Sequence, residues 1–426
     1  HAMSTVERTE RWLERVGDWS NSILVKETRQ ALKSRQFVIT FMLLLISAWT
    51  ISVFGLLLSG EAIEYGASGS SFFYIFYSVL MVAVLIIVPY GAFRSLLSER
   101  EQNTFELLSI TALSPKQIVW GKLLSALVQV FIYYSAITPF IAFSSLLPRF
   151  ELPAAAYLLV IAVLASLGLS MMALMFSTAA SQRQWQALNS VAVLGGLLFG
   201  FSTFFSTSLA IFAEVNIFEN RDFWWVNGFF LVAYVTYFIL CRQITTAQLT
   251  FQSDNRSSGM RMTCAVQFAL LWAGLVTYLL VEGAAGVGRT WVVALSVLST
   301  IHLCVVGLFV TTESDFLSRR IRRSIPKNPL LRLASVPFWP GGGRGYLYFV
   351  LQVFAMCAVA ITLFATAFAP MTTATPPAKL SVIQYVRHFW AGDAIVWIEE
   401  LQVVVCLACY AVIYISVAAV LGRWGR

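Results

Sequence analysis

Charged residues are scarce in this sequence. Only 12% of its 426 residues are Asp, Glu, Lys or Arg, whereas 58% are hydrophobic. An ordinary soluble domain is about 25% charged and about 45–50% apolar, so the composition excludes that class and indicates a polytopic membrane protein. Histidine is rarer still, with three residues in the chain. We interpret His1-Ala2 before Met3 as a remnant of cloning, which leaves His302 and His388, too few for a histidine-rich metal site.

Cysteines are also few, and their positions do not predict disulfides. All six lie within or at the edge of apolar runs, where thiols usually pack as small apolar side chains. Cys406 and Cys409 form a C-x-x-C in the middle of such a run. We therefore expect this pair to pack within a span rather than to act in redox chemistry.

Groups for catalysis and ion coupling are missing as well. The sequence has no G-x-x-x-x-G-K-[ST] phosphate loop, so we expect the Gly-rich segment 340–343 to be a linker. The apolar runs contain almost no buried carboxylates, which proton- and sodium-driven carriers typically need. Glu399-Glu400 lacks the following arginine and the paired histidines of intramembrane proteases with a double glutamate. We predict no enzyme activity and no cofactor on this chain, and we interpret His302 as a hydrogen-bonded structural residue.

Ten apolar runs are long enough to cross a membrane, which takes about 20 residues. They are Phe37–Leu58, Phe72–Phe93, Leu123–Leu147, Ala154–Phe176, Ala187–Ala213, Trp224–Cys241, Thr263–Val281, Trp291–Thr311, Tyr346–Phe368 and Leu401–Leu421. The predicted fold class is an all-α polytopic membrane protein. Pro89 and Pro139 lie inside the second and third runs and predict kinks there.

The basic residues orient these spans. If the N-terminus is inside, 24 of the 29 Lys and Arg residues fall in cytoplasmic segments, as the positive-inside rule requires. The pattern predicts that both termini are cytoplasmic. It also explains the formal charge of +8 by membrane topology, so we expect no nucleic-acid partner.

The N-terminal segment 1–36 has the pattern of an interfacial helix. Trp12, Leu13, Val16 and Trp19 recur at helical spacing among seven basic residues. An amphipathic, basic helix of this kind lies in the membrane interface and contacts lipid. The alternative is a helix packed on a soluble domain, but the sequence contains no such domain.

The polar segment Arg94–Lys122 connects the second and third spans and carries two helix-start signals. Asn103 with Glu106 has the spacing of a capping box, and Ser114 with Gln117 repeats it around Pro115 at the first helical position. Between them the pattern predicts a short helix over 104–113. This helix would have two apolar stripes, one formed by Phe105, Leu108 and Ala112 and the other by Leu107 and Ile110. Two stripes predict two packing neighbours, which could both belong to this chain or include a separate protein.

These residues resemble the signature of type-2 ATP-binding-cassette (ABC) exporter permeases. The similarity rests on Glu99-Arg100-Glu101, Thr104, Glu106-Leu107-Leu108, Leu113-Ser114 and Gly121-Lys122, and the chain differs at Asn103 and Ala112, where the family usually has glycine and often has proline.

The resemblance implies a permease subunit of a bacterial inner-membrane exporter whose helix 104–113 docks on a separate ATPase. ATP and Mg would then bind that ATPase, and a second, identical or related permease subunit would complete the pathway. The implied ATPase-coupling residues are Glu99, Arg100, Glu101, Thr104, Phe105, Glu106, Leu107, Leu108, Leu113 and Ser114.

The family's usual six spans suggest how the chain is divided. We predict a permease core over 37–250, a cytoplasmic linker over 251–262 and a four-span extension over 263–426. In the fifth span, Gly196, Gly200, Phe199 and Phe204 mark a dimer or pathway face, although packing within the chain explains them equally well. We expect this span to end near Phe205, with a re-entrant piece over 206–223.

Two further questions stay open from the sequence. The basic cluster in the segment 314–346 fits anionic lipid headgroups better than an ATPase contact. The alternative function is a non-transporting membrane scaffold or sensor that recruits an ABC ATPase, because such a protein would carry the same docking helix.

Overall fold

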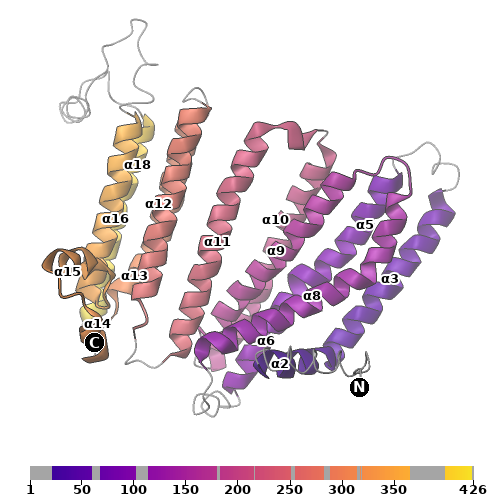
Figure 1. Cartoon of the computed structure of the whole chain (residues 1–426), viewed down its shortest axis with the longest axis horizontal. Helices are drawn as coiled ribbons and strands as arrows, with labels where there is room; N and C mark the ends of the chain where they lie inside the picture. Colours follow the sequence, from indigo (N-terminus) through magenta and orange to yellow (C-terminus); the bar gives the residue numbers. More distant parts are fainter. Residues whose placement is uncertain are drawn as a thin grey trace, which may run out of the picture. The chain divides into compact units, whose positions relative to one another are not determined.

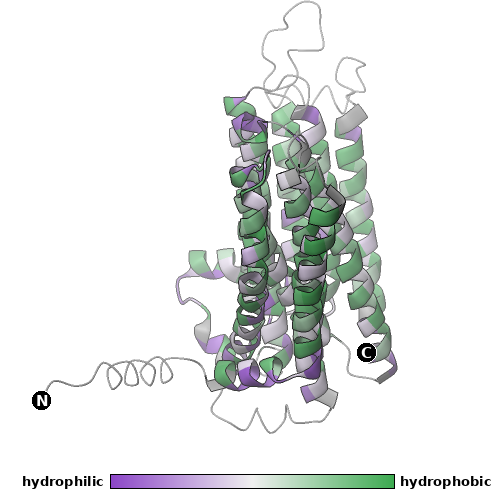
Figure 2. Ribbon diagram, turned by 90° about the vertical axis from the view of Figure 1, so that its right-hand side faces the viewer, coloured by the Kyte–Doolittle hydropathy of each residue, from purple (hydrophilic) through white to green (hydrophobic). Residues whose placement is uncertain are grey.

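The computed structural model describes residues 22–59, 68–101, 114–179, 183–214, 216–250, 255–282, 288–313, 317, 319–364 and 399–424. Within these ranges the chain is helical and has no strand. Ten helical segments are long and apolar enough to span a membrane, which confirms the all-helical, ten-span part of the prediction. Figure 2 shows hydrophobic residues along most of their length and hydrophilic residues near their ends.

The helices of the first half are α2 (Ser22–Leu32), α3 (Arg35–Ser59), α5 (Ser68–Val82), the π-helical η1 (Ala83–Ile87), α6 (Val88–Glu101), α8 (Pro115–Ser145), α9 (Leu152–Ser177) and α10 (Arg183–Ala213). The 3-10 turn η2 (Ile217–Glu219) precedes α11 (Arg221–Leu249). Then follow α12 (Ser258–Val281), α13 (Gly288–Thr311), α14 (Arg319–Ser324), α15 (Pro329–Ser335), the 3-10 turn η3 (Val336–Phe338), α16 (Gly342–Leu363) and α18 (Glu399–Trp424).

Contacts divide the chain into two compact units. Unit 1 comprises residues 1–220 with 244–249, and unit 2 comprises residues 221–243 with 250–426. Most of α11 therefore belongs with the last four spans, whereas the sequence-based division grouped it with the first five. The last residues of the expected linker 251–262 are helical, because α12 begins at Ser258.

In unit 1 the second span is central. It is formed by α5, η1 and α6. In an apolar 18-residue stretch of this span 56% of the residues are buried, more than in the other candidate spans of the described chain. Its side chains pack against α8 and α9. The short amphipathic helix α2 lies across the ends of α3 and α8 instead of running alongside them (Figure 1).

A π-helical turn precedes Pro89, one of the two prolines at which the sequence predicts kinks; the kinks themselves stay predictions. Residues Ala83–Ile87 form η1 directly before this proline, which has no N–H to donate to the preceding turn. The carbonyl of Val84, inside η1, accepts a 2.7 Å hydrogen bond from Ser166 Oγ of α9. A neighbouring helix thus satisfies a backbone group at the irregular turn, as a membrane span requires.

The expectation that the fifth span ends near Phe205 is wrong. α10 continues to Ala213 because side chains hold its second half against α5. Tyr74 donates a 3.1 Å hydrogen bond to the Phe205 carbonyl, and the rings of Phe73 and Phe212 stack with centroids 5.3 Å apart. The sequence between these contacts contains no proline or glycine to break the helix.

Unit 2 packs α13, α16 and α18 closely together. A Cβ added to Gly342, at the start of α16, would lie 2.6 Å from the Thr311 carbonyl oxygen, and one on Gly307 would lie 2.9 Å from Ile415 Cδ1. Only glycine permits these approaches without displacement of a neighbour.

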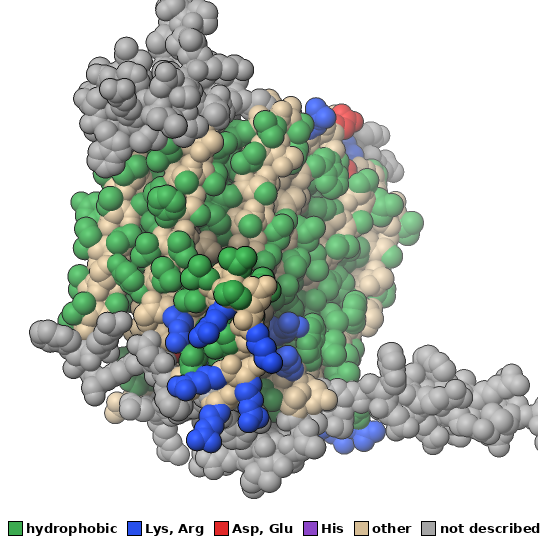
Figure 3. Space-filling view, turned by 60° about the vertical axis from the view of Figure 1, so that its left-hand side comes forward, with side chains coloured by type: hydrophobic (Ala, Val, Ile, Leu, Met, Phe, Trp, Pro, Cys, Tyr) green, Lys and Arg blue, Asp and Glu red, His purple; other side chains and the backbone are tan. Residues whose placement is uncertain are grey.

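The face of unit 2 around α14 and α15 is both basic and apolar. Figure 3 shows Lys and Arg side chains gathered at one end of the molecule beneath a broad hydrophobic surface. The exposed basic residues of this segment are Arg319, Arg322, Arg323, Lys327 and Arg332. Leu330 and Leu333 of α15 are 77% and 73% exposed beside them. Basic side chains beside exposed leucines are compatible with the predicted contact with anionic lipid headgroups, which stays a prediction.

Candidate functional site

A buried lysine joins three helices of unit 1. Lys122 Nζ of α8 lies 3.2 Å from Glu27 Oε1 of α2 and 3.1 Å from Glu99 Oε1 of α6. It also donates a 3.4 Å hydrogen bond to Ser95 Oγ of α6. The lysine side chain is 2% exposed, and the two carboxylate side chains are 10% and 16% exposed. We call Glu27, Glu99 and Lys122 the ion triad.

Local structure sets the direction of each member. α8 begins at the predicted capping box: Ser114 Oγ accepts from Gln117 N–H, and Gln117 Oε1 accepts 2.8 Å from the Ser114 N–H. Lys122 follows two helical turns later, on the buried face of α8. On α6, Ser95 and Glu99 are four residues apart and therefore share the face that meets Lys122.

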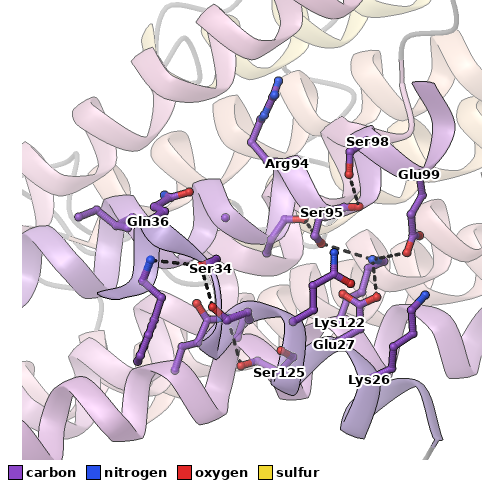
Figure 4. A pocket seen from close by; sticks show the side chains of 18 of the residues that line it. Lys26, Glu27, Ser34, Gln36, Arg94, Ser95, Ser98, Glu99, Lys122 and Ser125 are labelled. Carbon is purple, nitrogen blue, oxygen red and sulfur yellow. Dashed lines mark hydrogen bonds and ion pairs between the residues drawn. The ribbon is translucent and has the colours of Figure 1, made fainter. Parts of the chain in front are cut away.

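The ion triad borders a polar cavity of about 720 Å³ between α2, α6 and α8. Figure 4 shows Lys26, Arg94, Ser34 and Ser125 around the same space, together with the triad. An ion cluster beside such a space can exchange its partners with water or with another polar group. A buried pair surrounded by close-packed side chains cannot do so at comparable cost.

The Lys122–Glu99 contact joins the two helices that flank residues 102–113, which lie outside the described part of the chain. Glu99 lies near the end of α6 and Lys122 lies near the start of α8. Glu27 connects the same point to α2, so three separate helices meet at one cation.

The structure describes part of the predicted ATPase-coupling set. Glu99 is in the ion triad, Ser114 caps α8, and Arg100 and Glu101 end α6. The other residues implied by the resemblance lie outside the described part of the chain: Thr104, Phe105, Glu106, Leu107, Leu108 and Leu113. The short helix predicted over 104–113 stays a prediction.

Only part of the predicted dimer or pathway face on α10 packs against other helices of this chain. A Cβ on Gly200 would lie 3.5 Å from Leu169 of α9, whereas one on Gly196 would meet nothing within 4 Å. Phe199 is 71% exposed and Phe204 is half-buried. Gly200 therefore contributes to packing within unit 1, while Gly196 and Phe199 remain open.

A second buried cation lies in unit 2. Arg261 of α12 is fully buried, and its Nη2 lies 2.8 Å from Glu313 Oε2. It also donates to the carbonyls of Pro337, at 2.9 Å, of Trp339, and of Gly341, at 3.1 Å. Glu313 Oε2 in turn accepts from Ser257 Oγ and from the Gly341 N–H. We call this group the arginine clamp.

Sequence reasoning missed both clusters as sites. Lys122 was included only as a motif residue, Glu27 as part of an amphipathic helix, and Arg261 as part of a linker. Lys122 and Arg261 lie within two residues of an apolar run, and Glu27 lies in the amphipathic segment before the first run, where charges are expected at the water interface. A buried ion pair would have been predicted only by knowing that the cation points inward and faces an acidic residue on a neighbouring helix. The sequence does not show which helices are neighbours.

No protein-family model, curated protein or solved structure matches this chain. Its function is therefore inferred from its own residues and geometry.

Proposed function

We propose that this chain is the membrane permease subunit of an ATP-driven exporter of the type-2 ABC class. In this proposal a separate ATPase binds ATP and Mg and docks on residues 104–113. A second permease subunit, identical or related, completes the pathway in a bacterial inner membrane. The proposal rests on the motif between the second and third spans, because that motif lies where the resemblance requires the docking helix.

The pairing of Glu99 with Lys122 is the structural observation that best supports the proposal. Both residues belong to the motif, and their side chains lie 3.1 Å apart between α6 and α8. A push on the loop would therefore reach α6 and α8 together through a charge-assisted contact. Such a contact suits a loop that transmits force better than one that only connects two spans.

The second span has a feature suited to a change between two arrangements. The π turn η1 and Pro89 interrupt its regular helical hydrogen bonding above α6. Irregular turns of this kind concentrate bending in a span. Closure of the ATPase dimer would then tilt α6 about η1 and switch access between the two sides of the membrane.

Binding to the ATPase tests the docking site. The detergent-solubilised chain would be titrated with a candidate ABC ATPase, as wild type, Phe105→Ala and Glu106→Lys. If Phe105 is a central anchor, its truncation lowers affinity by about 30-fold, which corresponds to ~2 kcal/mol. Phe354→Ala is the matched control, because Phe354 is 71% exposed on α16 in unit 2. Unchanged affinity in both loop variants would refute the docking site.

ATP hydrolysis separates an exporter from a scaffold. In the exporter, the wild-type chain stimulates the ATPase. Lys122→Met retains binding while losing stimulation, because α6 and α8 then lose their contact through Glu99. A wild-type chain that binds the ATPase without changing its rate supports the scaffold or sensor instead.

A further inference from the structure

The short helix α15 of unit 2 buries none of its seven residues among the described parts of the chain, although three of them are leucines. Leu330, Leu331 and Leu333 are 77%, 59% and 73% exposed. A helix of about two turns is not stable alone in water, and helices in proteins gain most of their stability by packing an apolar face. We therefore expect a partner outside the described chain to cover α15.

The arginine clamp fixes the position of α15. Arg261 donates hydrogen bonds to the carbonyls of Pro337 and Trp339. Trp339 Nε1 in turn donates a 3.0 Å hydrogen bond to the hydroxyl of Ser335, the last residue of α15. Glu313, which follows α13, pairs with the same guanidinium. The two ends of the segment 313–337 are therefore joined at one buried side chain, and α15 is attached beside this point.

The exposed side chains of α16 indicate how deep in the membrane this point lies. α16 begins at Gly342, directly after the clamp, and Leu347, Leu351 and Phe354 are exposed on it at helical spacing. Leu347 follows Gly342 by only five residues, which is about 8 Å of helix. The interface on each side of the hydrocarbon core is about 5–8 Å thick. With these side chains in the hydrocarbon, the clamp and α15 lie at the level of the lipid headgroups.

The charges beside α15 select the kind of partner. Residues 316–335 contain six Lys and Arg and no Asp or Glu, and the next acidic residue along the sequence is Asp393. The basic side chains gather along the lower edge of the hydrophobic surface in Figure 3. A surface with exposed cations and exposed leucines side by side complements an anionic bilayer, because each Lys or Arg near such a bilayer strengthens binding about fivefold. A neutral or purely apolar partner would leave these cations without counter-charges.

We propose that residues 319–335 form a lipid anchor for anionic phospholipid, in which the leucines of α15 lie among the upper acyl chains and the basic residues bind the phosphates. The sequence predicts headgroup contact for the cations alone, whereas the leucines and the fixed level of α15 add insertion into the bilayer. Lipid of the leaflet at this end supplies the apolar cover that α15 lacks within the described chain. The lipid anchor does not depend on the ATPase, so either proposal can fail without the other.

Nanodiscs that hold the full chain test the lipid anchor. Leu331→dansylalanine places an environment-sensitive fluorophore on α15, where the native side chain is exposed. Discs of phosphatidylcholine are compared with discs of equal parts phosphatidylcholine and phosphatidylglycerol, each including a phosphatidylcholine with a nitroxide near the top of one acyl chain. In the anionic discs we expect strong nitroxide quenching and about tenfold weaker quenching by aqueous acrylamide than in the neutral discs. Equal quenching in the two kinds of disc would overturn the selection of anionic lipid.

Two double variants, each carrying the fluorophore, separate the charges from the leucines. Arg322→Gln/Arg323→Gln should raise acrylamide quenching in the anionic discs about tenfold, because two cations near the headgroups are lost. Leu330→Ser/Leu333→Ser should sharply reduce the nitroxide quenching, because α15 then has little apolar surface to insert. Leu280→Ser is the matched control, since Leu280 is 80% exposed at the end of α12 opposite the clamp, and the exposure of all five side chains predicts unchanged melting temperatures in detergent. Undiminished nitroxide quenching in both double variants would refute the lipid anchor.

A last measurement separates lipid from a protein partner. The docking site proposed for the ATPase is the segment 104–113, so adding the candidate ATPase to either kind of disc should leave the fluorescence of the reporter unchanged. Acrylamide quenching that falls only when the ATPase is added would assign this face to a protein and refute the lipid anchor.

Discussion

Lys122 in unit 1 and Arg261 in unit 2 are both buried, but different kinds of partners hold them. Lys122 is held by three side chains that come from two other helices, and it borders a polar cavity. Arg261 is held by Glu313 and by three backbone carbonyls from the single segment 337–341. Side chains can swing away from a cation, whereas carbonyls move only when the backbone moves.

The surroundings of Lys122 are also more open than those of Arg261. Beside the ion triad the structure has a cavity of about 720 Å³ and a span interrupted by a π turn. Beside the arginine clamp it has Gly342, which lets α16 approach the carbonyls at the end of α13. In unit 2 the cation is enclosed by backbone and close packing, whereas in unit 1 it joins side chains beside open space, which is the arrangement that the proposed coupling requires. The four predictions below test this difference.

The largest effect is expected from Arg261→Met. The substitution leaves Glu313 without its cation and removes the donor from three carbonyls, which should lower the free energy of unfolding by about 3–5 kcal/mol. Chemical denaturation in detergent, followed by intrinsic fluorescence, measures this change. Arg332→Met is the matched control, since Arg332 is exposed on α15. An Arg261→Met chain as stable as the control would show that unit 2 is not locked by this residue.

Lys122→Met should have a smaller effect on stability but a larger one on coupling. Two buried carboxylates would lose their shared cation, at a cost of about 3 kcal/mol, part of which their remaining exposure relieves. The triple variant Lys122→Met/Glu27→Gln/Glu99→Gln should recover most of this stability, because no unpaired charge remains. Stimulation of the ATPase should stay lost in both.

Lys116→Met, an exposed position on the same helix, serves as the control for that experiment. If the triple variant restored stimulation together with stability, the ion triad would be a packing feature of unit 1 and would not transmit force.

Gly342→Ala should cost about 1–3 kcal/mol, the usual range for overpacking. The added methyl would meet the Thr311 and Glu313 carbonyls at 2.6 and 2.9 Å, and neither backbone group can turn aside. Gly228→Ala is the control within unit 2, because a Cβ there meets nothing within 4 Å. Equal melting temperatures for the two variants would contradict the close packing ascribed to unit 2.

The elements of the fold that depend on local pattern could be predicted from the sequence. The ten spans and the capping box at Ser114 follow from apolar length and from residue spacing, and the structure contains them. The π turn η1 precedes Pro89, whose missing N–H is a local signal for an irregular turn. Each of these features is decided within about 20 residues of chain, so no knowledge of packing was needed.

The features that depend on packing between distant segments could not be predicted. α10 continues past Phe205 because α5, more than 120 residues earlier, contacts it, and no local signal marks that contact. Glu27 and Lys122 are 95 positions apart in the sequence, where each resembles an ordinary charge at the membrane–water interface. The orientation in the membrane, the helix over 104–113 and the partners stay predictions from charge and resemblance.

The smallest effect is expected from Glu27→Gln, which removes one carboxylate from the ion triad and leaves the other. Lys122 keeps Glu99 and Ser95, so the global stability should change little. The amides of α2 (Ser22–Leu32) should exchange hydrogen about tenfold faster, because a charge-assisted contact that holds this helix on α8 is weakened. Exchange in α6 should remain at the wild-type rate.

Two controls give this last experiment its meaning. Glu219→Gln removes an exposed carboxylate of unit 1 and should change nothing. Ser257→Ala removes one partner of Glu313 in the arginine clamp, yet exchange in α12 should stay slow because Arg261 and the Gly341 N–H still hold that carboxylate. If exchange in α12 accelerated as much as in α2, the two cations would be equivalent, and the difference between the ion triad and the arginine clamp would be refuted.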